Sequence, residues 1–582
     1  MVRGPWENER AVKASRLTVT KSQLEVPHAC VTAGHPLGAR VGAEILRRGG
    51  NAVDAAVATA FAMAVVEPFM SCLAGGGSML IHRPRTGTSV ALDFNVEAPQ
   101  RAHARMYRLG HGRSGDLFPW RAVEGDANVH GHLAVAVPGS VAGLALALER
   151  WGTLDLRDAV APAARLARLG VPIDWYLAGV TAMYAEELAR FPEAARTYLR
   201  GGRWPPRPAT LEGGDRVRYP ALARSLELIG KEGPSVFYRG ELAQAIEAEV
   251  RRGEGILDRT DLARYRVRVT QPLTGDYRGV TLLGMPGATG GVTALEMLNV
   301  LECFEAGSAG SGGPTSARAA HLRTEAIRVS FEDRLRWLGD PARIRAPWTA
   351  LAGKAYARAV AAGIRPDGRR HARRRVDPWR FERGQSKPAR APAASSTGEC
   401  TTQVCAVDRD RMLVSLTHTA VSLFGSKVVV PGTGLLLSNG MIWFDPEPGR
   451  PNSIESGKRA LVNMTPFLAL RDGAPYLSEG APGGLKIVSA VPQVLSNLID
   501  FALGPQAAVE APRLHTEGGP VQVDDRMGAA TVSELRRRGH RIVPLTETYS
   551  SFYFARPQVI EVTRRGLAAG VDHLRPATAM GF

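Results

Sequence analysis

The sequence lacks a segment long and apolar enough to cross a membrane. Its most apolar run, residues 52–66, contains Asp54 and Thr59 and ends before Glu67. These 15 residues fall short of the roughly 20 that span a bilayer as a helix, so the run predicts a buried helix of a globular protein. The first 26 residues also lack the apolar core of a secretion signal. We therefore expect no membrane association and a cytoplasmic location.

Cysteine is scarce, and its spacing has no pattern. The five cysteines include no C-x-x-C pair, which argues against a disulfide framework and against a zinc site. His130 and His132 could face a metal ion from one strand, but no third ligand is in sight, so a solvated pair is favoured. The sequence has no P-loop, no H-E-x-x-H and no G-x-S-x-G, and residues 75–77 are expected to form a tight glycine turn. We expect neither a metal ion nor another cofactor.

Lysine is also rare, with eight residues among 73 basic ones, and the net charge of +17 is carried by arginine. Ten of the basic residues lie between Arg365 and Arg390, and the rest are spread along the chain. A diffuse positive charge is more typical of a solvated surface than of a nucleic-acid groove. We expect no nucleic-acid partner.

Helical and strand patterns occur in blocks rather than in strict alternation. Residues 35–67 predict two packed helices separated at Gly49-Gly50, and residues 137–250 are mostly helical by period. The other predicted elements are strands from Met79 and at 89–94 and 278–284, a helix at 293–304, and a hairpin of strands at 401–407 and 413–419. Residues 365–400, rich in Arg, Pro, Ala and Ser, predict a flexible, exposed segment. This arrangement favours a layered α+β fold.

Threonines mark the hairpin. Thr401 and Thr402 begin its first strand, directly after the predicted flexible segment. Thr417 and Thr419 share one face of the second strand, and His418, on the opposite face, is expected to be a packing residue. Threonine is a common strand residue, so the pattern alone is only a weak indication of a catalytic threonine.

Several longer segments carry a resemblance to a known superfamily. They are GHPLGARVGAEILRRGGNAVDAAVATAFAMAVVEPF (34–69), AGGGSML (74–80), VPGSVAGLALALERWGTL (137–154), TTQVCAVD (401–408), FGSKVVVPGTGLLLSNGM (424–441) and GAPGGLKI (480–487). Together they closely resemble the gamma-glutamyltranspeptidase superfamily, in order and from about residue 28 to the C-terminus.

The resemblance implies an N-terminal-nucleophile hydrolase with a four-layer αββα sandwich. Such a precursor cuts itself before a threonine, here between Cys400 and Thr401. The products would be a large chain, 1–400, and a small chain, 401–582, which stay associated. By resemblance Thr401 is the nucleophile and its freed α-amine the base, Thr419 orients the nucleophile, and the backbone N–H groups of Gly483 and Gly484 form the oxyanion hole.

The positions that resemble the glutamate-binding residues of the superfamily have changed in this chain. The arginine and the serine pair that hold the α-carboxylate are replaced, and so is the cluster that holds the α-ammonium. The residues at these substrate-binding positions are Asn95, Val421, Gly440, Trp443, Val462 and Asn463. We expect a pocket for a flatter, less charged acyl group, as in the branch that resembles cephalosporin acylases.

The sequence therefore predicts a self-processing threonine hydrolase or acyltransferase for a small, non-glutamyl substrate. The bond cleaved is either an amide or a carbon–carbon bond next to a carbonyl, and antibiotic biosynthesis is one setting for such an enzyme. Two alternatives stay open: a true glutathione hydrolase, and an inactive homologue that acts as a binding protein.

Overall fold

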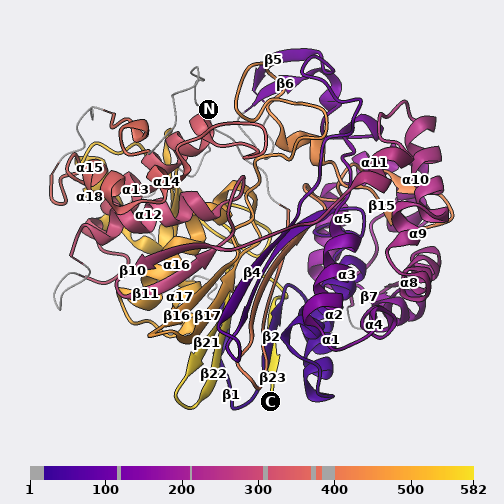
Figure 1. The fold of residues 1–582 in the computed structure, drawn as a ribbon, viewed down its shortest axis with the longest axis horizontal. Coiled ribbons are helices and arrows are strands. Elements are labelled where there is room, and N and C mark those ends of the chain that lie inside the picture. The colour runs from indigo at the N-terminus through magenta and orange to yellow at the C-terminus, as the bar shows by residue number, and fades with distance from the viewer. Residues whose placement is uncertain (1–18, 114–119, 210–212, 306–311, 369–374, 383–399) are drawn as a thin grey trace, which may run out of the picture.

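The computed structural model describes residues 19–113, 120–209, 213–305, 312–368, 375–382 and 400–582. Two seven-stranded antiparallel sheets form the centre of the molecule (Figure 1). The first contains, in spatial order, β1 (Leu24–Val26), β22 (Gly566–Val571), β21 (Gln558–Thr563), β17 (Ala474–Gly480), β16 (Phe467–Arg471), β11 (Val280–Gly284) and β10 (Leu273–Tyr277). The second contains β23 (Thr578–Gly581), β2 (Cys30–Ala33), β12 (Thr402–Val407), β13 (Leu413–Thr419), β3 (Gly76–Arg83), β4 (Thr88–Phe94) and β9 (Arg268–Thr270).

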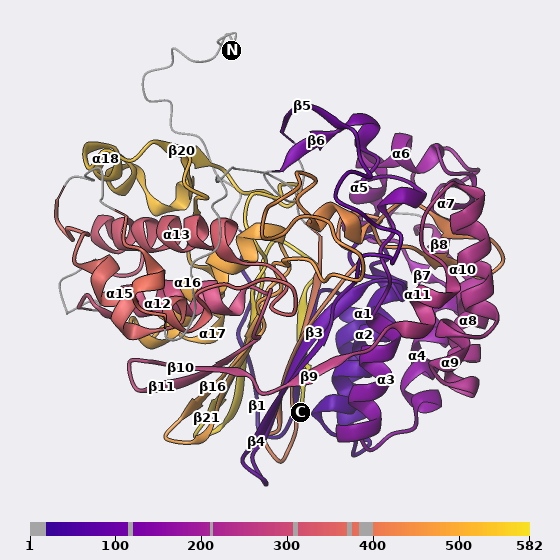
Figure 2. The same cartoon turned by 45° about the horizontal axis from the view of Figure 1, so that its top comes forward.

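Helices cover the outer face of each sheet (Figures 1 and 2). On the second sheet they are α1 (Pro36–Arg47), α2 (Ala52–Val66) and α3 (Ser140–Trp151), and α4 (Leu156–Leu169) packs on α2. On the first sheet they are α12 (Gly291–Glu302), α16 (Ile487–Ile499) and α17 (Pro505–Glu510), and α13 (Ala317–Trp337) packs on α12. The predicted four-layer αββα sandwich is confirmed.

The apolar run at 52–66 is a buried helix, as predicted. Every residue of α2 is buried, including Asp54, whose carboxylate accepts hydrogen bonds from Asn51 and Thr153. These hydrogen bonds offset the cost of burying a polar group in an otherwise apolar helix. No helix in the described part of the chain has the length and apolar character of a membrane span.

The remaining elements surround this sandwich. Residues 137–250 are mostly helical, as predicted, and continue through α5 (Trp175–Met183), α6 (Ala185–Ala189), α7 (Pro192–Tyr198), α8 (Pro220–Glu232), α9 (Ser235–Tyr238), α10 (Glu241–Arg252) and, just beyond, α11 (Arg259–Arg264). On the other side lie α14 (Trp348–Leu351), α15 (Lys354–Ala361) and α18 (Ala529–Arg537). Small sheets are formed by β5 (Leu109–Arg113) with β6 (Arg121–Val123), β7 (Val171–Pro172) with β8 (Arg216–Val217), β14 (Val429–Val430) with β15 (Leu435–Leu436), and β18 (Leu514–His515) with β19 (Val521–Asp524) and β20 (Ile542–Leu545).

Two local predictions were wrong or incomplete. Gly76 and Gly77 belong to β3 rather than to a tight turn. Glycine is needed at position 77 because a side chain there would strike the Phe94 ring and the Thr417 carbonyl. The strand at 278–284 has a hairpin partner, β10, that the sequence pattern did not reveal.

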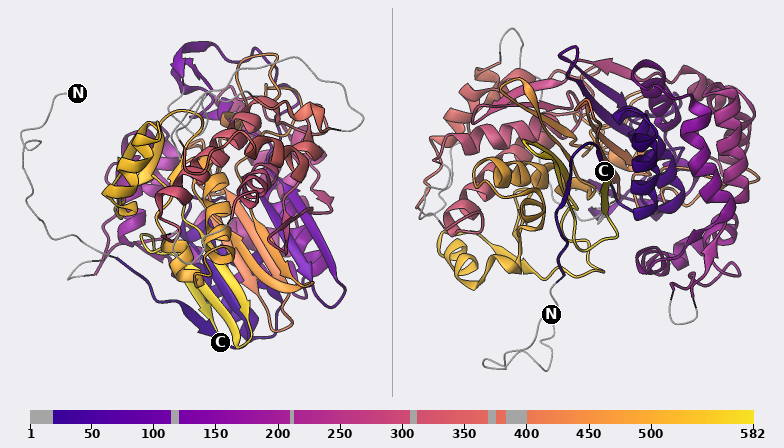
Figure 3. Two further views of the ribbon diagram at one scale, coloured as in Figure 1. Left: turned by 90° about the vertical axis from the view of Figure 1, so that its left-hand side faces the viewer. Right: turned by 90° about the horizontal axis from the view of Figure 1, so that it is seen from below.

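The predicted flexible segment, 365–400, lies largely outside the described residues, at 369–374 and 383–399. The short described piece 375–382 is packed, with the Trp379 ring against Trp337 and the Glu382 carboxylate accepting from Thr349. Each sheet contains strands from both sides of the Cys400–Thr401 bond. In the second sheet, for example, β12, β13 and β23 lie among β2, β3, β4 and β9. The last strand, β23, pairs with β2 near the start of the chain (Figure 3).

Candidate active site

Two threonine hydroxyls meet at the carbonyl group of Cys400. The predicted hairpin is present as β12 and β13, and its register places Thr402 opposite His418, so Thr401 reaches Thr419. The Thr401 hydroxyl donates to the Cys400 carbonyl oxygen. The Thr419 hydroxyl donates to the same oxygen at 3.2 Å and lies 3.4 Å from the Thr401 hydroxyl. Both threonines are buried, so water does not compete for these contacts.

The backbone around Thr419 is tightly constrained. Thr419 ends β13 opposite Gly76, and its hydroxyl accepts a 2.8 Å hydrogen bond from the backbone N–H of Val421. Val421 has a φ of +86°, a strained conformation for a β-branched residue. A side chain at Gly75 would lie 2.1 Å from the Thr419 carbonyl oxygen, so only glycine fits there. These contacts fix the Thr419 hydroxyl in one place.

Gly483 and Gly484 connect β17 to the helical segment that leads into α16. Their φ values are +137° and +57°, and a side chain at Gly483 would lie 2.5 Å from the Cα of Ala555. No acceptor within the described ranges takes a hydrogen bond from either backbone N–H. Free amides at the start of a helical segment are suited to binding a negatively charged oxygen.

A pocket opens beside Thr401. It is lined by Gly34, Glu67, Met70, Tyr176, Cys400, Thr401, Thr402, Pro482, Gly483, Phe552, Arg556, Gln558, Arg575 and Ala577. Burial raises the pKa of Glu67 to about 8, with a further rise from Asp174 and an opposing effect of Arg575. Glu67, Tyr176, Phe552 and Arg575 were missed by the sequence interpretation. The only signal was Glu67 itself, the charged residue that ends an apolar helix.

The six predicted substrate-binding positions are all buried. Val421, Trp443 and Val462 belong to one apolar cluster, and Gly440 lies against Val96 of that cluster. They do not line the pocket beside Thr401.

The two asparagines among these positions are engaged by the protein itself. The Asn95 side-chain oxygen accepts from the backbone N–H of Val96, and the Asn95 backbone carbonyl accepts from the Tyr265 hydroxyl. The Asn463 side chain accepts a 3.0 Å hydrogen bond from Arg334, whose guanidinium is buried and also binds the Val462 carbonyl.

The histidines noted in the sequence lie elsewhere. The imidazole of His418 packs against Ser140 and the Cys72 carbonyl, at 2.9 and 3.1 Å, and burial lowers its pKa to about 4. His132 contacts the Glu249 carboxylate at 2.9 Å. Within the described ranges, no three histidine, cysteine or acidic side chains are grouped as metal ligands would be.

Comparison with known proteins agrees with this architecture. Residues 38–582 match the family model for gamma-glutamyltranspeptidase. The chain is 38% identical over 532 residues to the acylase ACY 1 proenzyme of Pseudomonas sp. (strain SE83), covering 91% of this chain and 90% of that protein. It is 34% identical over 516 residues to the glutathione hydrolase proenzyme of Escherichia coli (strain K12), covering 86% and 84%. The crystal structure of cephalosporin acylase from Bacillus halodurans superposes with a TM-score of 0.82 at 27% identity, covering 98% of this chain and 99% of that one. The chain belongs to the gamma-glutamyltranspeptidase family of N-terminal-nucleophile hydrolases.

Proposed function

We propose that this protein is a self-processing amide hydrolase in which Thr401 is the nucleophile and the acyl group is not gamma-glutamyl. The observation that carries the proposal is the convergence of the Thr401 and Thr419 hydroxyls on the Cys400 carbonyl. Two buried hydroxyls on one carbonyl supply both a nucleophile and a donor that polarises the C=O bond.

In the cleavage step, the Thr401 hydroxyl oxygen attacks the Cys400 carbonyl carbon. The C–N bond to Thr401 breaks, an ester forms, and the hydroxyl proton ends on the released amine. Water then hydrolyses the ester, leaving a carboxylate on Cys400 and a free hydroxyl on Thr401. Thr419, which already donates to the carbonyl oxygen, stabilises the negative charge that develops there.

In the substrate reaction, the new α-amine of Thr401 serves as the general base. Its reference pKa is about 7.7–8.0, so a useful fraction is unprotonated near neutral pH. It takes the hydroxyl proton as the oxygen attacks the substrate carbonyl, and it returns the proton to the leaving amine. The backbone N–H groups of Gly483 and Gly484 bind the oxyanion, and water releases the acyl group from Thr401.

The buried substrate-binding positions support a non-glutamyl acyl group. Val421, Trp443 and Val462 provide no charged group for an α-carboxylate or an α-ammonium, and the Asn463 side-chain oxygen, the atom that could accept from an ammonium, already accepts from Arg334. Arg101, the nearest arginine in sequence to Asn95, instead binds the Gly255 and Ile256 carbonyls at the surface. An ammonium buried without a partner is strongly disfavoured.

A denaturing gel with mass analysis tests the nucleophile. We expect the purified protein to separate into two chains, the smaller beginning at Thr401, whereas Thr401→Ala remains one chain and Thr401→Ser still cleaves. Thr417→Ala is the control, because Thr417 lies on the neighbouring strand β13, on the same face as Thr419, but its hydroxyl donates to Gln403 instead of to the Cys400 carbonyl. An intact, active chain of 582 residues would contradict the proposal.

A further inference from the structure

The position of Cys400 identifies where an acyl group lies when it reacts with Thr401. Both cleavage of the precursor and attack on a substrate join an acyl carbon to the same Thr401 oxygen. In the precursor that acyl group is Cys400, which is buried and whose thiol lies 2.8 Å from the Phe69 carbonyl and 3.2 Å from the Met70 carbonyl. Once cleavage lets Cys400 leave, a substrate acyl group can take its place.

The walls of this pocket are aromatic. The rings of Tyr176 and Phe552 are 6.2 Å apart and nearly parallel, at 27°. The Arg575 guanidinium lies against both, 4.9 Å from the Tyr176 ring centre and 4.7 Å from that of Phe552. A flat group entering beside these rings would gain contact with π faces and with a cation.

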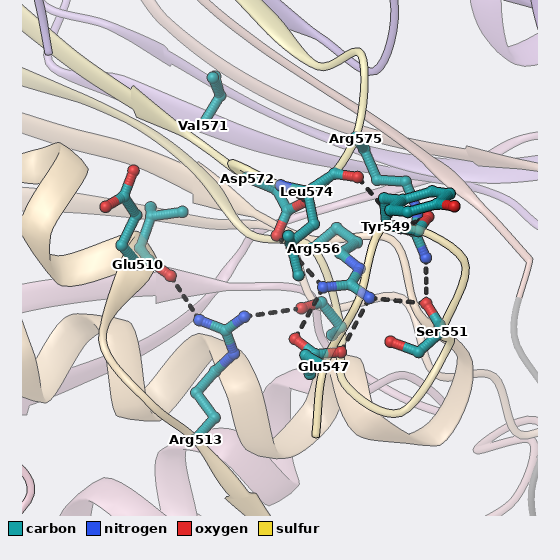
Figure 4. Close-up of polar contacts among 12 residues, drawn as sticks. Glu510, Arg513, Glu547, Tyr549, Ser551, Arg556, Val571, Asp572, Leu574 and Arg575 are labelled. Atoms are coloured by element: carbon teal, nitrogen blue, oxygen red, sulfur yellow. Dashed lines mark hydrogen bonds and ion pairs between the residues drawn. The ribbon is translucent and has the colours of Figure 1, made fainter. Parts of the chain in front are cut away.

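The two arginines of the pocket differ in how their charge is balanced (Figure 4). Arg556 forms a bidentate pair with Glu547, at 2.8 Å for both contacts, and lies 3.5 Å from Asp572. Arg575 donates instead to three backbone carbonyls, those of Tyr549 and Ser551 in the preceding loop and that of its neighbour Leu574. Its Nε has no hydrogen-bond partner and it forms no ion pair within the described part of the chain, although the residue is only 5% exposed.

Glu67 does not balance the charge of Arg575 near neutral pH. It lines the same pocket, but its carboxyl stays mostly protonated at pH 7 because burial raises its pKa to about 8. Carbonyl groups satisfy hydrogen bonds without cancelling a charge. The neighbouring Asp572, whose pKa is lowered against the effect of burial by Arg556, His573 and Arg575, forms its ion pair with Arg556. The pocket therefore contains a buried guanidinium that no carboxylate of the described residues contacts directly.

We propose that the pocket defined by Cys400, Tyr176, Phe552 and Arg575 is the acyl subsite of the processed enzyme, and that it binds an acyl group with a flat portion and a carboxylate held by Arg575. This inference rests on the proposed function, because Cys400 leaves the pocket only after cleavage. It specifies an acyl group that carries one negative charge, because Arg575 is the group of the pocket that would hold it.

Binding of benzoate and benzamide to the processed protein tests the proposal, since the two probes share a ring and differ in charge. We expect benzoate to bind at least tenfold more tightly than benzamide at pH 7 by titration calorimetry or ligand-observed NMR. Arg575→Gln should weaken benzoate at least tenfold and leave benzamide within twofold, and Arg575→Lys should retain part of the preference. Arg411→Gln is the matched control, because Arg411 also donates to backbone carbonyls, those of Pro27 and His28, outside the pocket.

The uncleaved Thr401→Ala chain adds a second comparison. It retains Cys400 in the pocket, so its affinity for benzoate should be at least tenfold lower than that of the processed protein. Equal affinities of the processed protein for benzoate and benzamide would overturn the inference, as would an unchanged benzoate affinity in a folded Arg575→Gln. If Arg575→Gln does not fold, the comparison of benzoate with benzamide on the unmodified, processed protein still tests the inference. A protein that cleaves but shows no preference refutes only the subsite, whereas a protein that does not cleave refutes the proposed function.

Discussion

Replacing Glu479 by methionine should stabilise the fold, and by more at pH 7 than at pH 5. Glu479 lies on β17 and is completely buried, and neither carboxyl oxygen has a hydrogen-bond partner in the described part of the chain. Its register neighbours on the adjacent strands are Phe467 and Val559, both apolar. Burial raises the pKa of Glu479 well above its usual range, so the folded protein holds this proton more tightly than the unfolded chain does.

The magnitude follows from proton linkage. Below the unfolded-state pKa of about 4.3, both states bind the proton and the carboxyl contributes no pH dependence. Above it the unfolded chain releases the proton while the folded protein keeps it, so the free energy of unfolding falls by about 1.36 kcal/mol per pH unit. From pH 5 to pH 7 this loss amounts to at most about 2.5 kcal/mol, the value for a carboxyl that keeps its proton in the fold over the whole interval. Methionine has a similar length, has no proton to lose and avoids the loss.

Urea unfolding followed by pulse proteolysis measures this difference. The parent protein and the methionine variant should both carry Thr401→Ala, so that each unfolds as one uncleaved chain. We expect the free energy of unfolding of the methionine variant, relative to the parent, to rise between pH 5 and pH 7, by up to about 2.5 kcal/mol. Glu455→Gln is the control, because Glu455 is exposed. A difference that does not change with pH would refute the reasoning, since the Glu479 carboxyl would then be ionised in the fold.

Three further predictions concern the site. Thr419→Ala should fold but lose roughly 100-fold or more in kcat, because the hydroxyl on the reacting carbonyl is removed; unchanged turnover would reduce Thr419 to a strand residue. A gamma-glutamyl anilide should be hydrolysed at least tenfold less efficiently, in kcat/KM, than the glutaryl anilide, which differs only by lacking the α-ammonium; equal values would show that another group binds the ammonium. Benzoate affinity should fall between pH 7 and pH 9 as Glu67, which faces Asp174, Tyr176 and Arg575, loses its proton near pH 8. In Glu67→Gln the affinity for benzoate should fall less over this pH range. The Thr401 amine titrates equally in both proteins, so an identical fall in affinity would show that the Glu67 carboxyl is not its cause.

The hairpin shows how far sequence reasoning reaches. Alternation in 401–407 and 413–419 predicts two strands, and the short connection fixes their pairing within one or two residues. This pairing alone brings Thr401 close to Thr419, as the register confirms. Their catalytic roles, and those of Gly483 and Gly484, came from the resemblance and stay predictions, as do the cytoplasmic location and the antibiotic setting.

The pocket beside Thr401 was beyond the reach of sequence patterns for a physical reason. The pocket brings together residues that are far apart in the sequence: Glu67, Tyr176, and the pair Phe552 and Arg575 near the C-terminus. No local period places such residues together; only the packing of α2, α5 and the last loops does. Gly77 illustrates the same limit, since its place in β3 follows from pairing with His418 and Phe94 on neighbouring strands, and the Phe94 ring leaves no room for a side chain there.

The interleaved sheets imply that cleavage acts locally. Both sheets contain strands from each side of the Cys400–Thr401 bond, so separating the two product chains would break the pairs β2–β12 and β3–β13 in the second sheet and β1–β22 and β11–β16 in the first. The hydrogen bonds and apolar contacts of those pairs keep the chains together after the peptide bond is lost. Cleavage can then have two consequences at one point: it creates the amine that serves as base, and it removes Cys400 from the pocket that the acyl group needs. An uncleaved chain lacks both the Thr401 α-amine and an empty pocket for the acyl group. The two effects can be measured separately, because benzoate binding depends on the empty pocket and does not require the amine.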